Sequence, residues 1–146
     1  MILISLTPVT IYFALHPIYT GDIFDEAEEI NTSYVFPKSK QLSIFVLKGC
    51  PHCKRTIPFI QKLRERNDQI SIQYVIVGKP NDRYPGFTNE IPSFCEKKYE
   101  PNPILLAPIT KGDYPCIVLS NNGKAEKKWS NDDFGMKTMD VIESFF

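Results

Sequence analysis

The chain has 146 residues, of which 42% are hydrophobic and 23% are charged. This length and composition suit one domain with an ordinary core, plus an appendage. Lysine plus arginine and aspartate plus glutamate number 17 each, so the formal net charge is zero. No global field attracts the chain to polyanions, and we therefore expect no nucleic-acid partner. Four cysteines are too few for a disulfide-stapled scaffold of this size.

Residues 1–40 are interpreted as an N-terminal extension. Residues 1–19 are largely apolar, and no charged residue occurs before Asp22. Two interpretations stay open for this stretch: a signal peptide or anchor that associates the protein with a membrane, or an extra strand. Apolar spacing over 22–31 favours a short helix, and residues 31–40 read as a linker. The compartment stays open in the same way, between export or anchoring and the cytoplasm.

The strongest motif is Cys50-Pro51-His52-Cys53, which stands between an apolar run and a helical pattern. Residues 42–47 are rich in branched and aromatic side chains, which predicts a central strand covered on both faces. Residues 56–66 have helical spacing, with Pro58 expected to kink the helix. Unpaired backbone N–H groups and the positive end of the helix dipole favour a thiolate on Cys50. Cys53 lies one helical turn on, within reach of a disulfide, so the pair is predicted to be a redox centre.

The run Cys-Pro-His-Cys-Lys-Arg-Thr-Ile-Pro resembles the Cys-x-x-Cys-Lys-x-x-x-Pro helix of the thioredoxin superfamily. The Pro-His dipeptide is that of the DsbA-type oxidases. The resemblance covers a domain at 41–146 and implies an α/β, thioredoxin-like fold, with a mixed central sheet and helices on both faces. It also implies thiol–disulfide exchange, with Cys50 as nucleophile, Cys53 as resolving thiol and His52 tuning the Cys50 sulfur.

Residues 70–77 alternate and are β-branched, which predicts a second strand beside the first. The proline-rich stretch at about 78–112 is interpreted as a family-specific insertion that carries partner or substrate specificity. Within it we expect a helix at 92–99, with Cys95 as a buried, unreactive thiol. Six apolar side chains of this stretch are expected to be buried: Ile91, Phe94, Ile104, Leu105, Leu106 and Ile109.

Pro115 matches the cis-proline that the superfamily places against its Cys-x-x-Cys. By this resemblance Tyr114 presents backbone groups to an extended peptide or to glutathione, and Lys48 and Pro51, beside Cys50, complete the substrate contacts. Cys116 is expected to point into the core. Asn-Asn-Gly at 121–123 predicts a hairpin turn, followed by a charged edge strand at 124–129.

The last helix is expected to be capped by Ser130 or Asn131. Asp132 and Asp133 match two acids of the glutaredoxin segment that holds the glutathione amino group. The paired glycines of that segment are replaced here by residues 129–131, so helix capping is the role expected for these acids. Five side chains are expected to form the apolar face of the helix: Met136, Met139, Val141, Ile142 and Phe145.

The first functional prediction is a thiol–disulfide oxidoreductase with no bound cofactor, acting on protein thiols and disulfides. A glutathione-dependent glutaredoxin, with glutathione as co-substrate, is the alternative within the same class. From another class, the domain could be a non-catalytic binding module or a soft-metal chaperone using Cys50 and Cys53. No dedicated metal site is expected, although zinc held by all four cysteines stays open.

Overall fold

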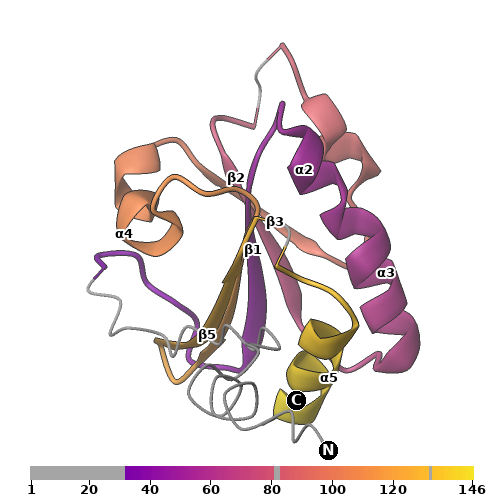
Figure 1. Ribbon diagram of the computed structural model, residues 1–146. Helices are drawn as coiled ribbons and strands as arrows, with labels where there is room; N and C mark the ends of the chain where they lie inside the picture. The colour runs from indigo at the N-terminus through magenta and orange to yellow at the C-terminus, as the bar shows by residue number, and fades with distance from the viewer. Residues whose placement is uncertain (1–31, 81–82, 132) are drawn as a thin grey trace, which may run out of the picture.

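The computed structural model describes residues 32–80, 83–131 and 133–146 (Figure 1). The expected features of residues 1–31, whether anchor, strand or short helix, lie outside this range. In the part of the chain that is described, no helix has the length and hydrophobicity needed to cross a membrane.

A mixed five-stranded sheet forms the centre of the molecule, in the order β3-β2-β1-β4-β5 (Figure 1). The middle strand is β1 (Gln41–Leu47), as its apolar run predicts. Its neighbour β2 (Ile72–Val77) is parallel to it, and β3 (Glu96–Glu100) is parallel to β2. On the other side, β4 (Cys116–Asn121) and β5 (Lys124–Ser130) run antiparallel.

Helices cover both faces of this sheet. One face carries α2 (Pro51–Lys54), α3 (Thr56–Arg66) and α5 (Met136–Phe145), and the other carries the short 3-10 helix η2 (Pro103–Leu106) and α4 (Ala107–Thr110) (Figure 1). Strand alternation sends Ile44 and Val46 into the first core and Phe45 into the second. The expected thioredoxin-like α/β fold is confirmed.

The helix after the cysteine motif is interrupted at Arg55, between α2 and α3. Pro58 explains the break, because it has no N–H for the carbonyl of Lys54 and its ring crowds that carbonyl. The expected kink is therefore present, one turn before the proline. Beyond it, Ile57, Ile60 and Leu63 pack into the core as their spacing predicts.

The helix expected at 92–99 is wrong. Cys95 N–H donates to the Pro92 carbonyl at 3.0 Å in a turn, and β3 follows at once as a charged, exposed edge strand. Pairing with β2 supplies the backbone hydrogen-bond partners that a helix would otherwise have provided. Two expected burials also fail: Phe94 is 39% exposed and Ile104 is 77% exposed.

The last helix starts later than expected, and its cap is a different residue. Ser130 ends β5, and Asn131 follows with a left-handed φ of 54°. The cap is Gly135, whose N–H donates to the Thr138 hydroxyl at 3.2 Å. Met136 is 65% exposed and does not join the apolar face, whereas Met139 and Ile142 are buried there.

The hairpin between β4 and β5 is confirmed. Asn122 and Gly123 both have positive φ angles, 52° and 79°, as a tight two-residue turn of this kind requires. The turn brings β5 to the open edge of the sheet, where Lys124 and Glu126 are exposed.

Candidate active site at the cysteine turn

Cys50 lies where β1 leaves the sheet and α2 begins. It is the N-cap of α2, it is half-buried, and its thiol is free. The N–H of Cys53 donates to Cys50 Sγ at 3.3 Å. This contact gives the sulfur one backbone donor. Because α2 is interrupted after one turn, its dipole is only that of a four-residue helix.

Cys53 is fully buried below Cys50. Burial raises the pKa of the Cys53 thiol well above its usual range, and the hydrogen bond with Cys50 raises it further. The two thiols therefore differ: Cys50 is partly open to solvent, whereas Cys53 has no exposed surface.

A buried hydroxyl pair supports the backbone of Cys53. Thr56 Oγ1 donates to the Cys53 carbonyl at 2.6 Å and lies 2.8 Å from the Tyr74 hydroxyl. Since the single Thr56 proton is used on that carbonyl, the Tyr74 O–H must donate to Thr56. Burial raises the pKa of Tyr74, so its hydroxyl stays protonated. Neither residue was identified from the sequence. The one available signal was that Thr56 is a polar residue on the side of α3 that is otherwise apolar and buried.

The Tyr114–Pro115 peptide bond is cis, as the resemblance implied. The Cys50 thiol donates to the Tyr114 carbonyl at 3.8 Å, so the loop before β4 lies against the nucleophile. The Pro115 carbonyl accepts the Asn131 N–H at 2.8 Å, which ties this loop to the end of β5. The structure thus brings Tyr114 and Pro115 to Cys50.

The remaining expected site residues take varied positions. His52 and Pro51 are exposed on α2. Lys48 Nζ donates to the Lys79 carbonyl at 2.5 Å and lies 5.5 Å from the Tyr99 ring centroid, toward β3. Asp133 is exposed in the turn after β5, and Asp132 lies outside the described residues. Asp133 does not cap α5, whose cap is Gly135, so that expectation is wrong for Asp133. The substrate roles of these residues stay predictions.

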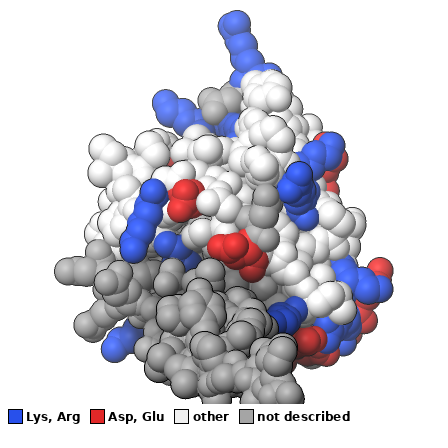
Figure 2. All heavy atoms as spheres, viewed as in Figure 1, with Lys and Arg blue, Asp and Glu red and all other residues white. Residues whose placement is uncertain are grey.

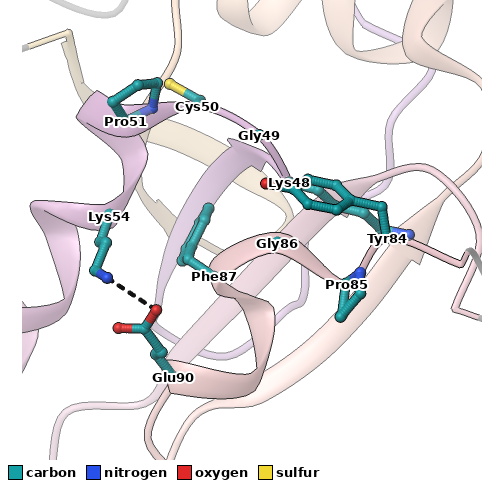
Figure 3. Close-up of a pocket in the computed structure, with 10 residues that line it drawn as sticks. All are labelled: Lys48, Gly49, Cys50, Pro51, Lys54, Tyr84, Pro85, Gly86, Phe87 and Glu90. Carbon is teal, nitrogen blue, oxygen red and sulfur yellow. Dashed lines mark hydrogen bonds and ion pairs between the residues drawn. The ribbon is translucent and has the colours of Figure 1, made fainter.

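A pocket of about 350 Å³ opens beside the cysteine turn (Figure 3). Residues 48–51 and Lys54 form one wall, and Tyr84, Phe87 and Glu90 contribute to the other. The second wall belongs to the 3-10 helix η1 (Gly86–Glu90) and the residues before it. We expected the stretch at 78–112 to carry partner or substrate specificity, and the second wall of the pocket lies in this stretch. The side chains that form the wall were not singled out from the sequence.

The other two cysteines are buried in separate cores. Burial raises the pKa of Cys95 to about 12 and that of Cys116 to about 11. Cys116 lies on the opposite face of the sheet from Cys53 and Cys95, which confirms its expected place in the core. The four cysteines therefore do not converge on one zinc ion. Among the described residues, no group of three potential ligands could hold a metal.

Comparisons with known proteins agree with the fold. No protein-family model matches the sequence, and no curated protein matches it. Three solved structures are similar to this chain in fold, each with a match probability of 1.00. The first, the thioredoxin domain of a thiol-disulfide oxidoreductase from Bacteroides vulgatus, has a TM-score of 0.60 at 18% identity, covering 74% of this chain and 79% of that one.

The second is described as a thiol:disulfide interchange protein DsbE of Chlorobium tepidum, with a TM-score of 0.59 at 14% identity over 83% of this chain and 94% of that one. The third, StoA from Bacillus subtilis, has a TM-score of 0.54 at 17% identity over 76% and 85%. These likenesses place the chain in the thioredoxin-like fold class. At such identities they speak to the fold, and the chemistry has to be argued from the site.

Proposed function

We propose that this protein is a thiol–disulfide oxidoreductase that works by dithiol exchange through Cys50 and Cys53. The observation that carries the proposal is the unequal pair: Cys50 is reachable and receives the Cys53 N–H at 3.3 Å, whereas Cys53 is fully buried. An exposed attacking thiol above a buried resolving thiol is the arrangement that two-step exchange requires. The oxidoreductases that share this fold support the proposal.

In the first step, the Cys50 thiolate attacks one sulfur of a substrate disulfide. A bond forms between Cys50 Sγ and that sulfur, the substrate S–S bond breaks, and the other substrate sulfur leaves as a thiolate. That thiolate takes a proton from water. Tyr114, whose carbonyl already faces Cys50 Sγ, offers the backbone groups against which the substrate chain can align.

In the second step, Cys53 loses its proton and attacks Cys50 Sγ. The mixed disulfide breaks, the remaining substrate sulfur leaves as a thiolate, and a Cys50–Cys53 disulfide remains. The substrate disulfide has gained two electrons and the protein dithiol has lost two, so no bound cofactor is required. The reverse sequence oxidises a substrate dithiol.

The proposed partners are protein thiols and disulfides. Glutathione enters the proposal as a candidate co-substrate, and the first experiment includes it as a separate arm. The DsbA-like dipeptide at 51–52 adds the proposal that His52 favours the reduced form of the pair.

Insulin reduction and a glutathione mixed-disulfide assay test the proposal on the wild type, Cys50→Ser, Cys53→Ser and the control Cys95→Ala. We expect Cys50→Ser to abolish turnover. Cys53→Ser should accumulate a covalent adduct at Cys50, because the resolving thiol is missing. Cys95→Ala should retain activity. Equal turnover by the wild type and Cys50→Ser would end the proposal.

A further inference from the structure

The wall of η1 is held firmly against the turn that precedes Cys50. Gly86 has a φ of +57°, and a Cβ built on it would lie 2.0 Å from the Lys48 carbonyl oxygen, so the two backbones touch. Phe87 is buried under the wall, and the Thr88 hydroxyl donates to the Pro85 carbonyl at 2.6 Å. The position of η1 is therefore set by the same turn that sets Cys50.

A second hollow of about 390 Å³ continues the first along α2 and α3. It is lined by Pro51, Ile57 and Pro58, together with Lys54, Arg55 and Glu90. Pro51, Lys54 and Glu90 line both hollows. Because these three residues line both hollows, we take the two as one groove that starts beside Cys50. The Lys54–Glu90 ion pair lies along it (Figure 3).

The chemistry of the groove favours uncharged side chains. Tyr84 is 67% exposed, and its ring lies across the turn at Gly49, 3.8 Å from where a Cβ there would be (Figure 3). Six of the thirteen residues that line the two hollows are proline, tyrosine, phenylalanine or isoleucine. The charges of Lys54 and Glu90 satisfy each other at 2.9 Å. A large exposed aromatic ring beside a reactive thiol is a common anchor for a protein partner.

The division of the groove suits an extended chain. Alternate side chains of an extended peptide point the same way, about 7 Å apart. The second hollow is mainly apolar, and the first contains the exposed Tyr84 ring, so the two neighbouring hollows offer places for two such side chains. A carboxylate-rich tripeptide such as glutathione has no matching apolar groups.

We propose that this groove binds an extended polypeptide segment of the disulfide-bearing substrate, taking an apolar or aromatic side chain close to the reacting cysteine. The inference rests on the proposed function. It adds a contact on the η1 side of Cys50, lined by residues other than Tyr114 and Pro115.

A kinetic comparison tests the groove with two disulfide substrates. One is hydroxyethyl disulfide, and the other is a disulfide-linked decapeptide with tryptophan two residues from its cysteine. Tyr84→Ala should lower kcat/KM for the peptide at least fivefold, mainly through KM, and change hydroxyethyl disulfide turnover less than twofold. Met136→Ala, an exposed apolar residue on α5, is the matched control and should change neither. An equal effect of Tyr84→Ala on both substrates, or none on either, overturns the proposal.

A binding experiment separates this inference from the proposed function. The same peptide with its cysteine S-methylated cannot exchange disulfides, so its binding to the wild type is independent of redox activity. Titration followed by amide NMR shifts should perturb residues 84–90 and 51–58, and Tyr84→Ala should weaken the affinity. Perturbation confined to the region around Tyr114, or no perturbation, contradicts the groove. Binding by a protein that turns over neither substrate would overturn the proposed function alone.

Discussion

Cys53 is fully buried and Cys50 is half-buried, so we expect the two thiols to differ in reactivity. The same reasoning applies to Cys95 and Cys116, each of which is surrounded by apolar side chains. A buried neutral thiol is favoured over its thiolate, and this has a measurable consequence for stability at alkaline pH.

Cys116→Ala should flatten the loss of stability at alkaline pH. Burial raises the pKa of Cys116 from 9.0 to about 11. Above pH 9 the unfolded chain loses this proton and the folded chain keeps it, so the free energy of unfolding falls as pH rises. The contribution is fully present below pH 9 and is lost toward pH 11, at up to about 1.4 kcal/mol per pH unit.

Urea unfolding of the wild type and Cys116→Ala between pH 8 and pH 11 measures this slope. The variant should lose stability less steeply over that window, whatever its stability at pH 8. Parallel curves for the two proteins would show that the Cys116 thiol titrates alike in the folded and unfolded chains.

The Thr56–Tyr74 pair gives a second prediction at the residue scale. Thr56→Val leaves the Tyr74 hydroxyl without a partner in a buried site and removes one donor from the Cys53 carbonyl, at a cost of about 1–3 kcal/mol. Thr56→Ser keeps the hydroxyl and should recover most of that loss. Chemical denaturation of the reduced proteins measures both, and equal losses for valine and serine would mean that the hydrogen bonds contribute nothing net.

At the scale of elements, η1 fixes the turn before the nucleophile. Gly86→Ala should destabilise the fold by at least about 2 kcal/mol more than Gly112→Ala, because only Gly86 combines a positive φ with a backbone contact. Gly112 has a φ of +84° and open space around its Cα, so it isolates the conformational cost.

Thermal unfolding and the rate of Cys50 alkylation measure this comparison. We expect Gly86→Ala to change the alkylation rate as well, since its clash displaces the Lys48 carbonyl next to the cysteine turn. Two alanine variants that behave alike would show that the contact between η1 and Lys48 is dispensable.

The elements that could be predicted from sequence are those with strong local signals. The run at 42–47 and the alternation at 70–77 matched β1 and β2, and the Asn-Gly turn matched the hairpin after β4. The strand β3 was missed because Glu-Lys-Lys-Tyr-Glu lacks apolar alternation, and only its pairing with β2 makes it a strand. The start of α5 was missed because the sequence offered better capping residues upstream than Gly135.

The residues of the candidate site can be divided in the same way, into those with a strong local signal and those that only the fold brings together. Cys50 and Cys53 could be predicted because the motif fixes their spacing, and Pro115 was predicted from the family resemblance. Thr56 and Tyr74 meet only after β2 has paired with β1. Tyr84 and Phe87 come to the cysteine turn through the close contact of Gly86, which no local pattern announces. Long-range contacts thus decide the parts of the site that sequence reasoning left out.

At the scale of the whole molecule, the cysteine motif lies with α2, α3 and α5 on one face of the sheet, and η2 and α4 cover the other (Figure 1). The visible surface mixes positive, negative and uncharged areas without a field of one sign (Figure 2). This fits a neutral chain whose partners are selected by local contacts beside Cys50, and it agrees with the balance of charges in the sequence.

The most direct test is redox titration of the full chain, with peptide mapping of the oxidised product. We predict a single two-electron couple, a disulfide between Cys50 and Cys53, and unmodified Cys95 and Cys116. Its potential should lie above about −270 mV, toward the value of about −120 mV at the oxidising end of this fold class. Failure to form a Cys50–Cys53 disulfide in an oxidising buffer would contradict the account.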